Sequence, residues 1–262
     1  MMNHKNLGIT FFFRHFLLLV IIIIFWQVFS CYVFPRFNPM ASNILPPPSS
    51  VVAMGWDLLK NGKLFTHILA SLRRIIMGFL LAVVLGVPLG ILMGISRKIR
   101  LQMTPLIELL RPIPPFAWLP LALLWFGIGD RESIFLIVIA AIFPIVLNTV
   151  EGMDKIDIRL VHAAQSLGCT KKRDLLLKIL LPASLPSIFL GLRVGLGFSW
   201  MVLVGAEMIG SISGLGYLIL DSRNLVLPNL ALLGMAIIGI IGYFLDLGMR
   251  RLSNLVLIWL ES

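Results

Sequence analysis

Long apolar runs separated by short charged or proline-rich segments dominate the chain. A run of about 20 apolar residues is long enough to cross the hydrocarbon core of a bilayer as a helix. We place such spans near residues 11–29, 68–95, 133–150, 188–209 and 229–248, with a proline-interrupted segment over residues 101–126 between the second and the third of them. The pattern therefore predicts an all-α membrane protein with six transmembrane helices.

Two of the predicted spans carry small residues at a spacing of four. In the second span these are Gly86, Gly90 and Gly94, and the fifth span repeats the spacing in Gly191 and Gly195. Small residues on one helix face let a second helix approach closely, which a lipid-facing surface does not require. We expect this packing to occur within the chain, and a seam between two copies is the alternative.

The segment over residues 101–126 cannot be an uninterrupted helix. Its prolines are Pro105, Pro112, Pro114, Pro115 and Pro120. Each removes a backbone donor, and lipid cannot satisfy the carbonyl groups that lose their partners. We expect the segment to be buried in protein or to line a wet path. A tight turn over residues 127–130 should lead into the next span, with Pro144 as a kink.

The positive residues indicate the orientation in the membrane. Thirteen of the 22 Lys and Arg residues lie in segments placed inside, among them Arg97, Lys98 and Arg100 of a predicted turn, and five lie in segments placed outside. An excess of positive residues marks the cytoplasmic side. Both termini and the central loop are therefore predicted to be cytoplasmic. Residues 51–60 and 210–228 should lie at the outer surface.

Composition agrees with this class. Hydrophobic residues make up 59% of the 262, charged residues only 13%, and the mean hydropathy is +0.99. The formal net charge of +10 does not point to nucleic acid, because the positive residues are distributed by side of the membrane and do not form one polar domain.

The longest charged interruption, residues 151–186, should form two short helices. Asp157 can cap a helix over residues 158–167 that Gly168 ends, and Thr170 can cap a second helix that Pro182 stops. Apolar and small residues recur on the first helix at helical spacing: Ile156, Leu160, Ala163 and Leu167. Such a stripe suits a groove on a partner, and the alternative is a solvated loop between spans.

The same interruption resembles the EAA loop of permease subunits from binding-protein-dependent ATP-binding-cassette (ABC) importers. In that family the loop is a coupling helix that docks into a cytoplasmic ATPase subunit. The resemblance rests on His162-Ala163-Ala164, Gly168 and Leu181-Pro182, and it assigns the coupling role to Leu160, His162, Ala163, Ala164, Leu167, Gly168, Leu181 and Pro182. The family usually has Glu where this chain has His162, which cannot supply an acidic contact.

Further segments over residues 70–94, 108–130, 191–200 and 206–219 resemble the permeases that import sulfonates, taurine and nitrate. The resemblance implies one permease domain over residues 1–262, with a core at about 65–255 and a coupling loop at 151–183, in the type I importer (MetI-like) fold. It also implies a bacterial inner membrane location, a periplasmic binding protein, a second permease copy forming a homodimer, and a taurine- or alkanesulfonate-like cargo. Nitrate, bicarbonate or another small solute is the alternative cargo.

No catalytic machinery is recognisable. The chain contains no G-x-x-x-x-G-K-[ST] motif, so we expect ATP to be bound by the partner subunit and no cofactor to be bound here. Cys31 and Cys169 are expected on opposite faces of the membrane and cannot pair. No Cys/His cluster has the spacing of metal ligands. The chain is predicted to be non-enzymatic.

Ionisable residues in the spans must pair, snorkel or face water, because a charge at the bilayer centre is costly. Glu108 and Arg111 are three residues apart and can neutralise each other. Alternatively, Arg111 and Arg193 give a pathway a positive field that attracts an anion, with Trp118 as a further pathway candidate. Glu207 is expected to hold an outer gate in an ion pair.

Two other classes of function are alternatives to an importer subunit. A secondary transporter driven by an ion gradient should show inverted repeats and intramembrane acidic residues, of which Glu108 and Glu207 are the candidates. A structural membrane subunit would need no pathway, and the proline-broken segment argues against it.

Overall fold

The computed structural model describes residues 17–18, 20–37, 44–169 and 171–258. Every regular element in these residues is a helix, which confirms the predicted all-α class. The chain forms two compact units, Met1–Thr66 with Leu218–Ala236 and His67–Tyr217 with Ile237–Ser262. The predicted single permease domain stays a prediction.

The first unit contains an apolar helix over Val20–Phe37 and the helix α4, Pro48–Lys60. Ser49 is hydrogen-bonded to Gln27, through its backbone N–H to Oε1 and through its hydroxyl from Nε2, both at 3.1 Å. The helix α4 confirms the amphipathic stretch expected at residues 51–60 but begins three residues earlier, at Pro48. Residues 11–16 of the predicted first span lie outside the described residues.

In the second unit, α5 (Lys63–Ile95) and α8 (Asp130–Asp154) run parallel and in register. A Cβ added to Gly78 would lie 2.6 Å from the side chain of Ile137, and one on Gly90 would lie 2.5 Å from that of Thr149. Each glycine meets the residue 59 positions later. Close packing of α5 therefore occurs within the chain, as the small-residue spacing indicated.

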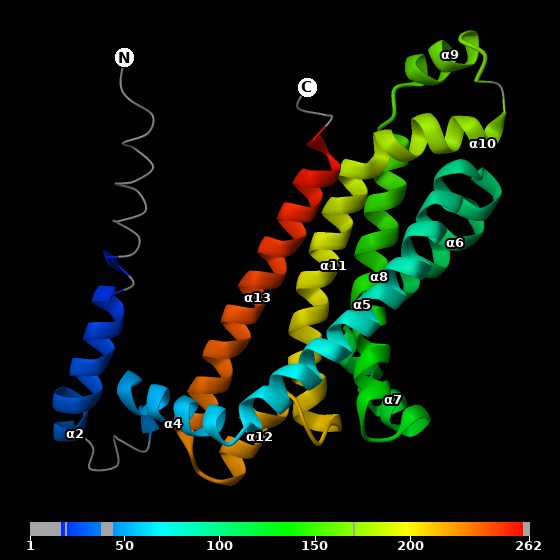
Figure 1. Cartoon of the computed structure of the whole chain (residues 1–262). Coiled ribbons are helices and arrows are strands. Elements are labelled where there is room, and N and C mark those ends of the chain that lie inside the picture. Colours follow the sequence, from blue (N-terminus) through cyan, green and yellow to red (C-terminus); the bar gives the residue numbers. More distant parts are fainter. Residues whose placement is uncertain (1–16, 19, 38–43, 170, 259–262) are drawn as a thin grey trace, which may run out of the picture. The chain divides into compact units, whose positions relative to one another are not determined.

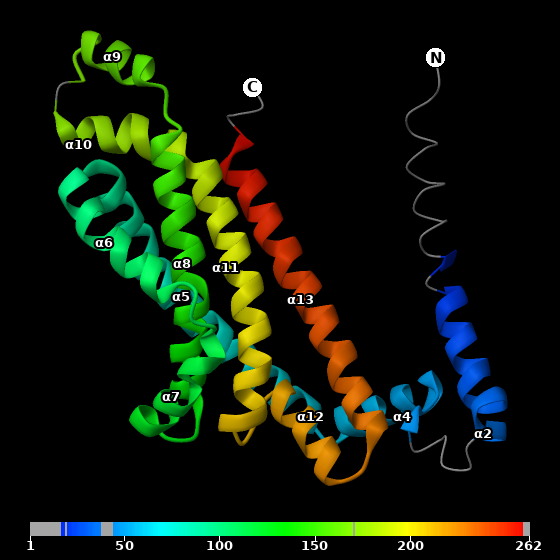
Figure 2. The same ribbon diagram turned by 180° about the vertical axis from the view of Figure 1, so that it is seen from behind.

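The helix α11, Leu181–Gly210, packs antiparallel against α8 (Figures 1 and 2). Gly191 lies against Asn148, and the hydroxyl of Ser199 donates to the Ile137 carbonyl at 3.3 Å. The repeated spacing in this span thus serves the same purpose as in α5. Because both neighbours place small residues against it, α8 is the central helix of the unit.

The largest core cluster joins these three helices and the start of α12, Leu215–Asn224. Its buried members are Ile75, Phe79, Ala82, Ile137, Ala141, Ile145, Leu196, Trp200, Leu203 and Leu215. The indole Nε1 of Trp200 donates to the Ile238 carbonyl at 3.2 Å and so ties in α13, Pro228–Val256. The sixth span was predicted to end at residue 248, but the helix continues to Val256.

The proline-rich third segment is broken, as predicted. It consists of α6 (Arg97–Leu110), a 3₁₀ turn (Pro115–Trp118) and α7 (Leu119–Phe126), and the two parts are bent by 87°. Pro120 lies in the first turn of α7, where its missing N–H needs no partner. The prediction that residues 97–100 form a turn is wrong, because the Ser96 side chain accepts from the Ile99 N–H and caps α6 there.

The glycine turn before α8 is confirmed. Gly127 has φ 73° and Gly129 has φ 146°, values that strongly favour glycine. The Gly129 N–H donates to the Gly210 carbonyl at 2.9 Å, which joins the start of α8 to the end of α11. The span itself begins at Asp130 and ends at Asp154, longer at both ends than predicted.

Pro182 does not end a helix as predicted, and Pro35 likewise lies inside a continuous helical stretch. Pro35 and Pro182 each lie two residues after a π-helical turn, Phe29–Val33 and Leu176–Leu180. A π turn is wider than an α turn, and we attribute the continuation to the room this leaves for the proline ring. Residues 172–210 are consequently one helical stretch. The expected cap Thr170 lies outside the described residues.

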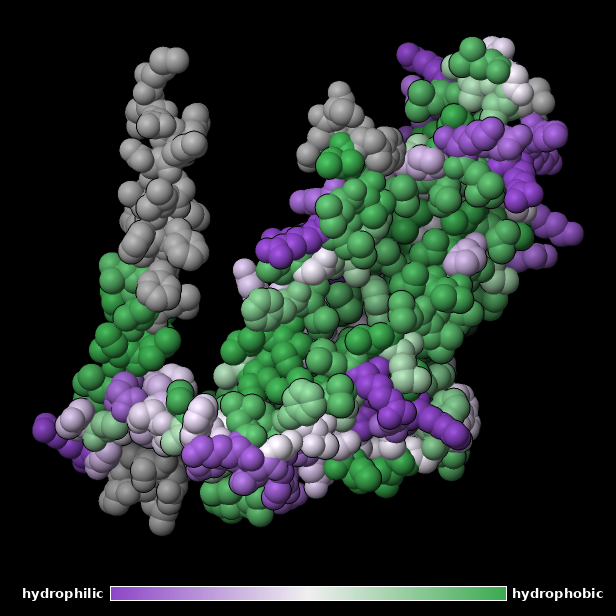
Figure 3. Space-filling model, viewed as in Figure 1, coloured by the Kyte–Doolittle hydropathy of each residue, from purple (hydrophilic) through white to green (hydrophobic). Residues whose placement is uncertain are grey.

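Among the described residues, five helices are long and apolar enough to cross a membrane, or six if the bent pair counts as one span. Figure 3 shows hydrophobic residues over much of α5 and α13 in the second unit, with a hydrophilic patch on each, and hydrophilic residues near α9 and α10. This distribution is that of a polytopic membrane protein.

Close packing of α5 on α8 predicts a matched pair of outcomes. Gly90→Ala should lower the unfolding temperature of the purified protein, because its Cβ overlaps Thr149 and overpacking costs about 1–3 kcal/mol. Gly239→Ala in α13 meets no atom within 4 Å and should be neutral or stabilising. Equal unfolding temperatures for the two variants would contradict the packing described.

Candidate functional site

The central loop carries the helix α9, Ile158–Ser166. The Asp157 carboxylate accepts the Arg159 N–H at 2.8 Å, and Gly168 takes φ 91°, which confirms both predicted ends. Ala164 is buried, and α9 contacts α10 (Lys172–Leu175) and the π turn after it. In Figures 1 and 2 the helix lies beyond α10, at the opposite end of α8 from α7.

The predicted coupling residues divide into an exposed and a less exposed set. Leu160 is 55% exposed and Leu167 is 89% exposed, and His162, Ala163 and Gly168 are exposed as well. Leu181 and Pro182 are half-buried in the first turn of α11 and do not extend this surface. The stripe of α9 is thus apolar and open, while its coupling role stays a prediction.

A groove of about 610 Å³ runs along α8 in the second unit. Its walls are one face of α8, the exposed Val194 and Phe198 of α11, and the proline-rich break with Arg111. A second hollow of about 510 Å³ shares Arg100, Arg111, Leu147 and Val150 with it. The proline-rich segment therefore lines an open space, one of the two environments expected for it.

Some of the charged residues that line the groove form ion pairs and one does not. Arg100 binds Asp154 through two hydrogen bonds of 2.7 and 2.6 Å, and Glu151 pairs with Lys155 at 2.7 Å. No ion pair is formed by Arg111 in the described part of the chain. The predicted neutralisation of Arg111 by Glu108 is wrong, since the two groups make no ion pair although both line the second hollow.

The other pathway candidates lie elsewhere. Arg193 pairs with Asp246 of α13 at 2.6 Å, and Asp246 also pairs with Arg250. Trp118 packs with the cluster around Leu119, and its buried indole N–H has no partner in the structure. These residues do not line the groove with Arg111, and their roles stay predictions.

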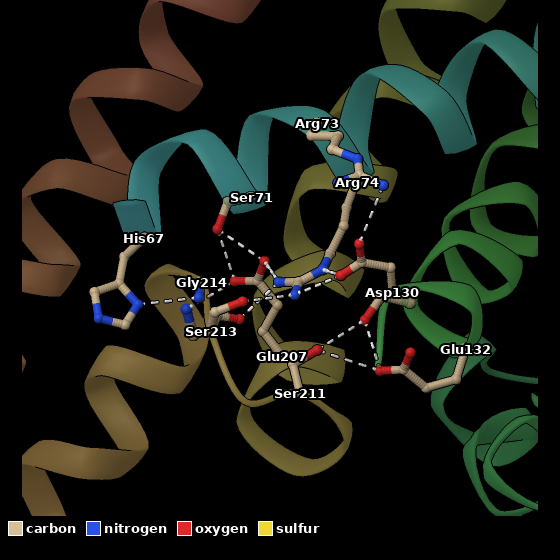
Figure 4. A network of polar contacts seen from close by, with 12 residues as sticks. His67, Ser71, Arg73, Arg74, Asp130, Glu132, Glu207, Ser211, Ser213 and Gly214 are labelled. Carbon is tan, nitrogen blue, oxygen red and sulfur yellow. Dashed lines mark hydrogen bonds and ion pairs between the residues drawn. The ribbon is translucent and has the colours of Figure 1, made fainter. Parts of the chain in front are cut away.

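Glu207 belongs to a buried polar network near the start of α8 (Figure 4). Its carboxylate accepts from the Arg74 guanidinium at 2.7 Å and from the hydroxyl of Ser71 at 2.8 Å. Arg74 also bonds Asp130, at 2.8 Å, and the Ser213 carbonyl. Arg74 is 2% exposed and Glu207 is fully buried, so each charge is compensated inside the protein.

The network fixes the loop between α11 and α12. Glu207 accepts the Gly216 N–H at 2.9 Å, Ser71 accepts that of Leu215 at 2.9 Å, and His67 Nδ1 accepts that of Gly214 at 3.1 Å. A Cβ on Gly214 would overlap the Glu207 carboxylate, so only glycine fits there. The loop therefore depends on one ion pair in α5 and α11.

Sequence reasoning expected an ion pair for Glu207 but did not identify its partner. That partner is Arg74 of α5. The available signal was that two unlike charges, each too costly to leave alone in a span, can satisfy each other. Glu132 beside this network was also missed, and it is fully buried with one carboxylate oxygen unpartnered.

Comparison with known proteins agrees with this architecture. The sequence pattern of the family described as binding-protein-dependent transport system inner membrane component matches residues 86–256. A protein named as an ABC transporter permease in Methanocaldococcus jannaschii is 40% identical, over 99% of this chain and 98% of its own.

Two further relatives are named by cargo. An aliphatic sulfonates transport permease of Bacillus subtilis is 36% identical over 94% of this chain and 87% of its own. The taurine transport system permease of Escherichia coli is 36% identical over 82% of this chain and 80% of its own. An inward-facing structure of the MetNI methionine ABC transporter shares the fold, with a TM-score of 0.63 at 18% identity over 74% of this chain and 95% of that one.

These features define a non-catalytic membrane subunit of an ATP-driven importer of small solutes. The chain belongs to the family of binding-protein-dependent transport system inner membrane components. It is a multi-pass inner membrane protein, and ATP is hydrolysed by a separate ATPase subunit. Family membership implies that ATPase and a substrate-binding protein as partners. The ion-gradient transporter and the structural subunit are therefore set aside.

The buried ion pair predicts a large effect of one substitution. Arg74→Gln leaves Glu207 buried without its charged partner, which should destabilise the protein by about 3–5 kcal/mol. Arg193→Gln removes a half-exposed arginine from a similar pair and should cost at most about 1 kcal/mol. Unfolding temperatures in one detergent test this, and a loss in Arg74→Gln no larger than that in Arg193→Gln would contradict the predicted effect of burial.

Proposed function

We propose that this chain imports a small anionic solute of the sulfonate class as one of two identical permease copies. Each copy engages one ATPase through α9, and a periplasmic binding protein delivers the cargo. Both termini and α9 lie on the cytoplasmic side. The observation that carries the cargo class is Arg111, a groove cation without an ion pair among the described residues, in a chain whose relatives include permeases named for sulfonates and taurine.

The electrostatics of the groove support an anionic cargo. Arg100 and Asp154 neutralise each other, as do Lys155 and Glu151. Arg111 is exposed in the break between α6 and the 3₁₀ turn, where an incoming anion can reach its guanidinium. A sulfonate offers three oxygens, and the planar guanidinium can bind two of them at once. The negative charge of Glu108, in the adjoining hollow, confines the positive potential to the surroundings of Arg111.

The shape of α9 supports docking on a partner. Ile158, Leu160 and Leu167 expose more than half of their surface, although hydrophobic side chains of soluble segments are normally covered. The short side chain of Ala163 permits close approach of the helix backbone. A cleft on the ATPase would bury this stripe, and movement of the ATPases would then move the end of α8.

The second copy is supported by the open side of the groove. Val194 and Phe198 line it and are 38% and 51% exposed, and Met201 on the same helix is 69% exposed. A second copy on this face would enclose one pathway between two grooves. Alternating access by rigid-body motion of the helices follows from such an arrangement, with no chemical change to the cargo.

Docking by α9 predicts loss of the ATPase from a defined variant. Leu160→Asp with Leu167→Asp should abolish co-purification of the co-expressed ATPase, because two charges replace the apolar contact. Leu225→Asp is the control, since Leu225 is 54% exposed and lies in the segment predicted outside. Retention of the ATPase by the double variant would refute docking through this face.

The cargo class predicts a charge requirement at Arg111. In proteoliposomes with the ATPase and binding protein, Arg111→Gln should reduce ATP-dependent uptake of labelled taurine about tenfold, equivalent to 1.4 kcal/mol. Arg111→Lys should retain part of it because the charge remains. Arg97→Gln, outside both hollows, should transport normally. Unchanged uptake by Arg111→Gln, or competition by nitrate but not by ethanesulfonate, would overturn the sulfonate assignment.

A further inference from the structure

The helix α6 is a separate rigid segment between two breaks. At its start, Ser96 takes an extended conformation with φ −111° and ψ 107° and caps α6, which ends the preceding helix α5. At its other end, Arg111 is followed by the prolines of the 87° bend. Between these breaks the 14 residues of α6 can turn as one body.

Three contacts of α6 lie at different points along its length. Along one face, Ile107 is buried in a cluster with Met93, Val146 and Val150, and Ile99 and Met103 pack against the same cluster, so α6 bears on α5 and α8 over most of its length. Near the start, Arg100 is bonded to Asp154, and just past the end Arg111 faces the groove. Arg100 and Arg111 are roughly 16 Å apart at 1.5 Å per helical residue. One packed helix therefore joins the Asp154 contact to the groove.

The Arg100 bond connects α6 to the residues that lead into α9. Asp154 is the last residue of α8, and α9 begins four residues later, at Ile158. Arg100 Nη1 donates to Asp154 Oδ1 at 2.7 Å, and Nη2 donates to Oδ2 at 2.6 Å. A two-point bond between a guanidinium and a carboxylate fixes direction as well as distance. Displacement of α9 therefore reaches α6 through Asp154 and Arg100.

We infer that Arg100 and Asp154 are positioning residues that transmit movement of α9 to the groove by displacing α6 as one body. The inference rests on the proposed docking of an ATPase on α9, and not on the cargo. The side chains of the pair are 42% and 41% exposed, so it contributes little to stability. The pair instead fixes a position, because it joins the start of α6 to the end of α8 and both residues line the groove.

Electron paramagnetic resonance tests the movement without cargo. Spin labels at Leu109→Cys in α6 and Tyr243→Cys in α13, 71% and 62% exposed, report the distance between these helices, with Cys31 and Cys169 replaced by Ser. In the complete importer, ATP should change this distance in the parent chain. In Arg100→Gln and in Asp154→Asn the population shifted by ATP should fall about fivefold, the upper range for such a pair.

Matched variants distinguish transmission from general damage. Lys155→Gln breaks an ion pair within α8 alone and should leave the shift unchanged. The exchanged pair Arg100→Asp with Asp154→Arg should restore the shift, and it decides the case if a single variant fails to assemble. An unaltered shift in Arg100→Gln, or no restoration in an assembled exchanged pair, overturns the inference. No ATP effect in the parent chain would instead count against docking on α9.

Discussion

Close approach of helix backbones on both sides of α8 is the constraint on which the second unit depends. One face of α8 is contacted by four glycines of α5, which are Gly78, Gly86, Gly90 and Gly94. The other face is contacted by Gly191 and Gly195 of α11. Lipid and apolar side chains compete equally for an apolar helix surface, so hydrophobicity alone does not drive such association. The area of contact between the helices drives it, and glycine increases this area because it lets the backbones approach closely. The groove, α9 and the buried network are all attached to this three-helix arrangement.

A different ion pair lies at each end of α8. At the start, Asp130 joins a buried pair of Arg74 and Glu207 that holds the loop before α12. At the end, Asp154 forms an exposed pair with Arg100 close to α9. Burial decides what each pair does. The first cannot be opened without leaving charge uncompensated in the interior, whereas the second can open into water at a cost of about 1 kcal/mol or less.

Local departures from the α-helix allow long segments to continue. The π turns before Pro35 and Pro182 keep helices intact where proline normally ends them, so α10, the π turn and α11 connect the loop to the central bundle without a flexible joint. In contrast, the clustered Pro112, Pro114 and Pro115 do break their segment, and that break forms part of the groove wall. The number and spacing of prolines decide between these outcomes.

The sequence by itself determined the spans, the glycine faces, the capped helix α9 and the family, because each depends on short-range patterns: apolar length, a spacing of four, and a cap followed by glycine. Only the tertiary structure decided which charges meet. Arg74 and Glu207 are 133 positions apart and Arg100 and Asp154 are 54 apart, and no local pattern specifies such pairs. Glu108 and Arg111 also show that local pattern does not decide pairing. Their spacing along the helix permits a contact, but the surroundings of the helix decide whether the contact forms.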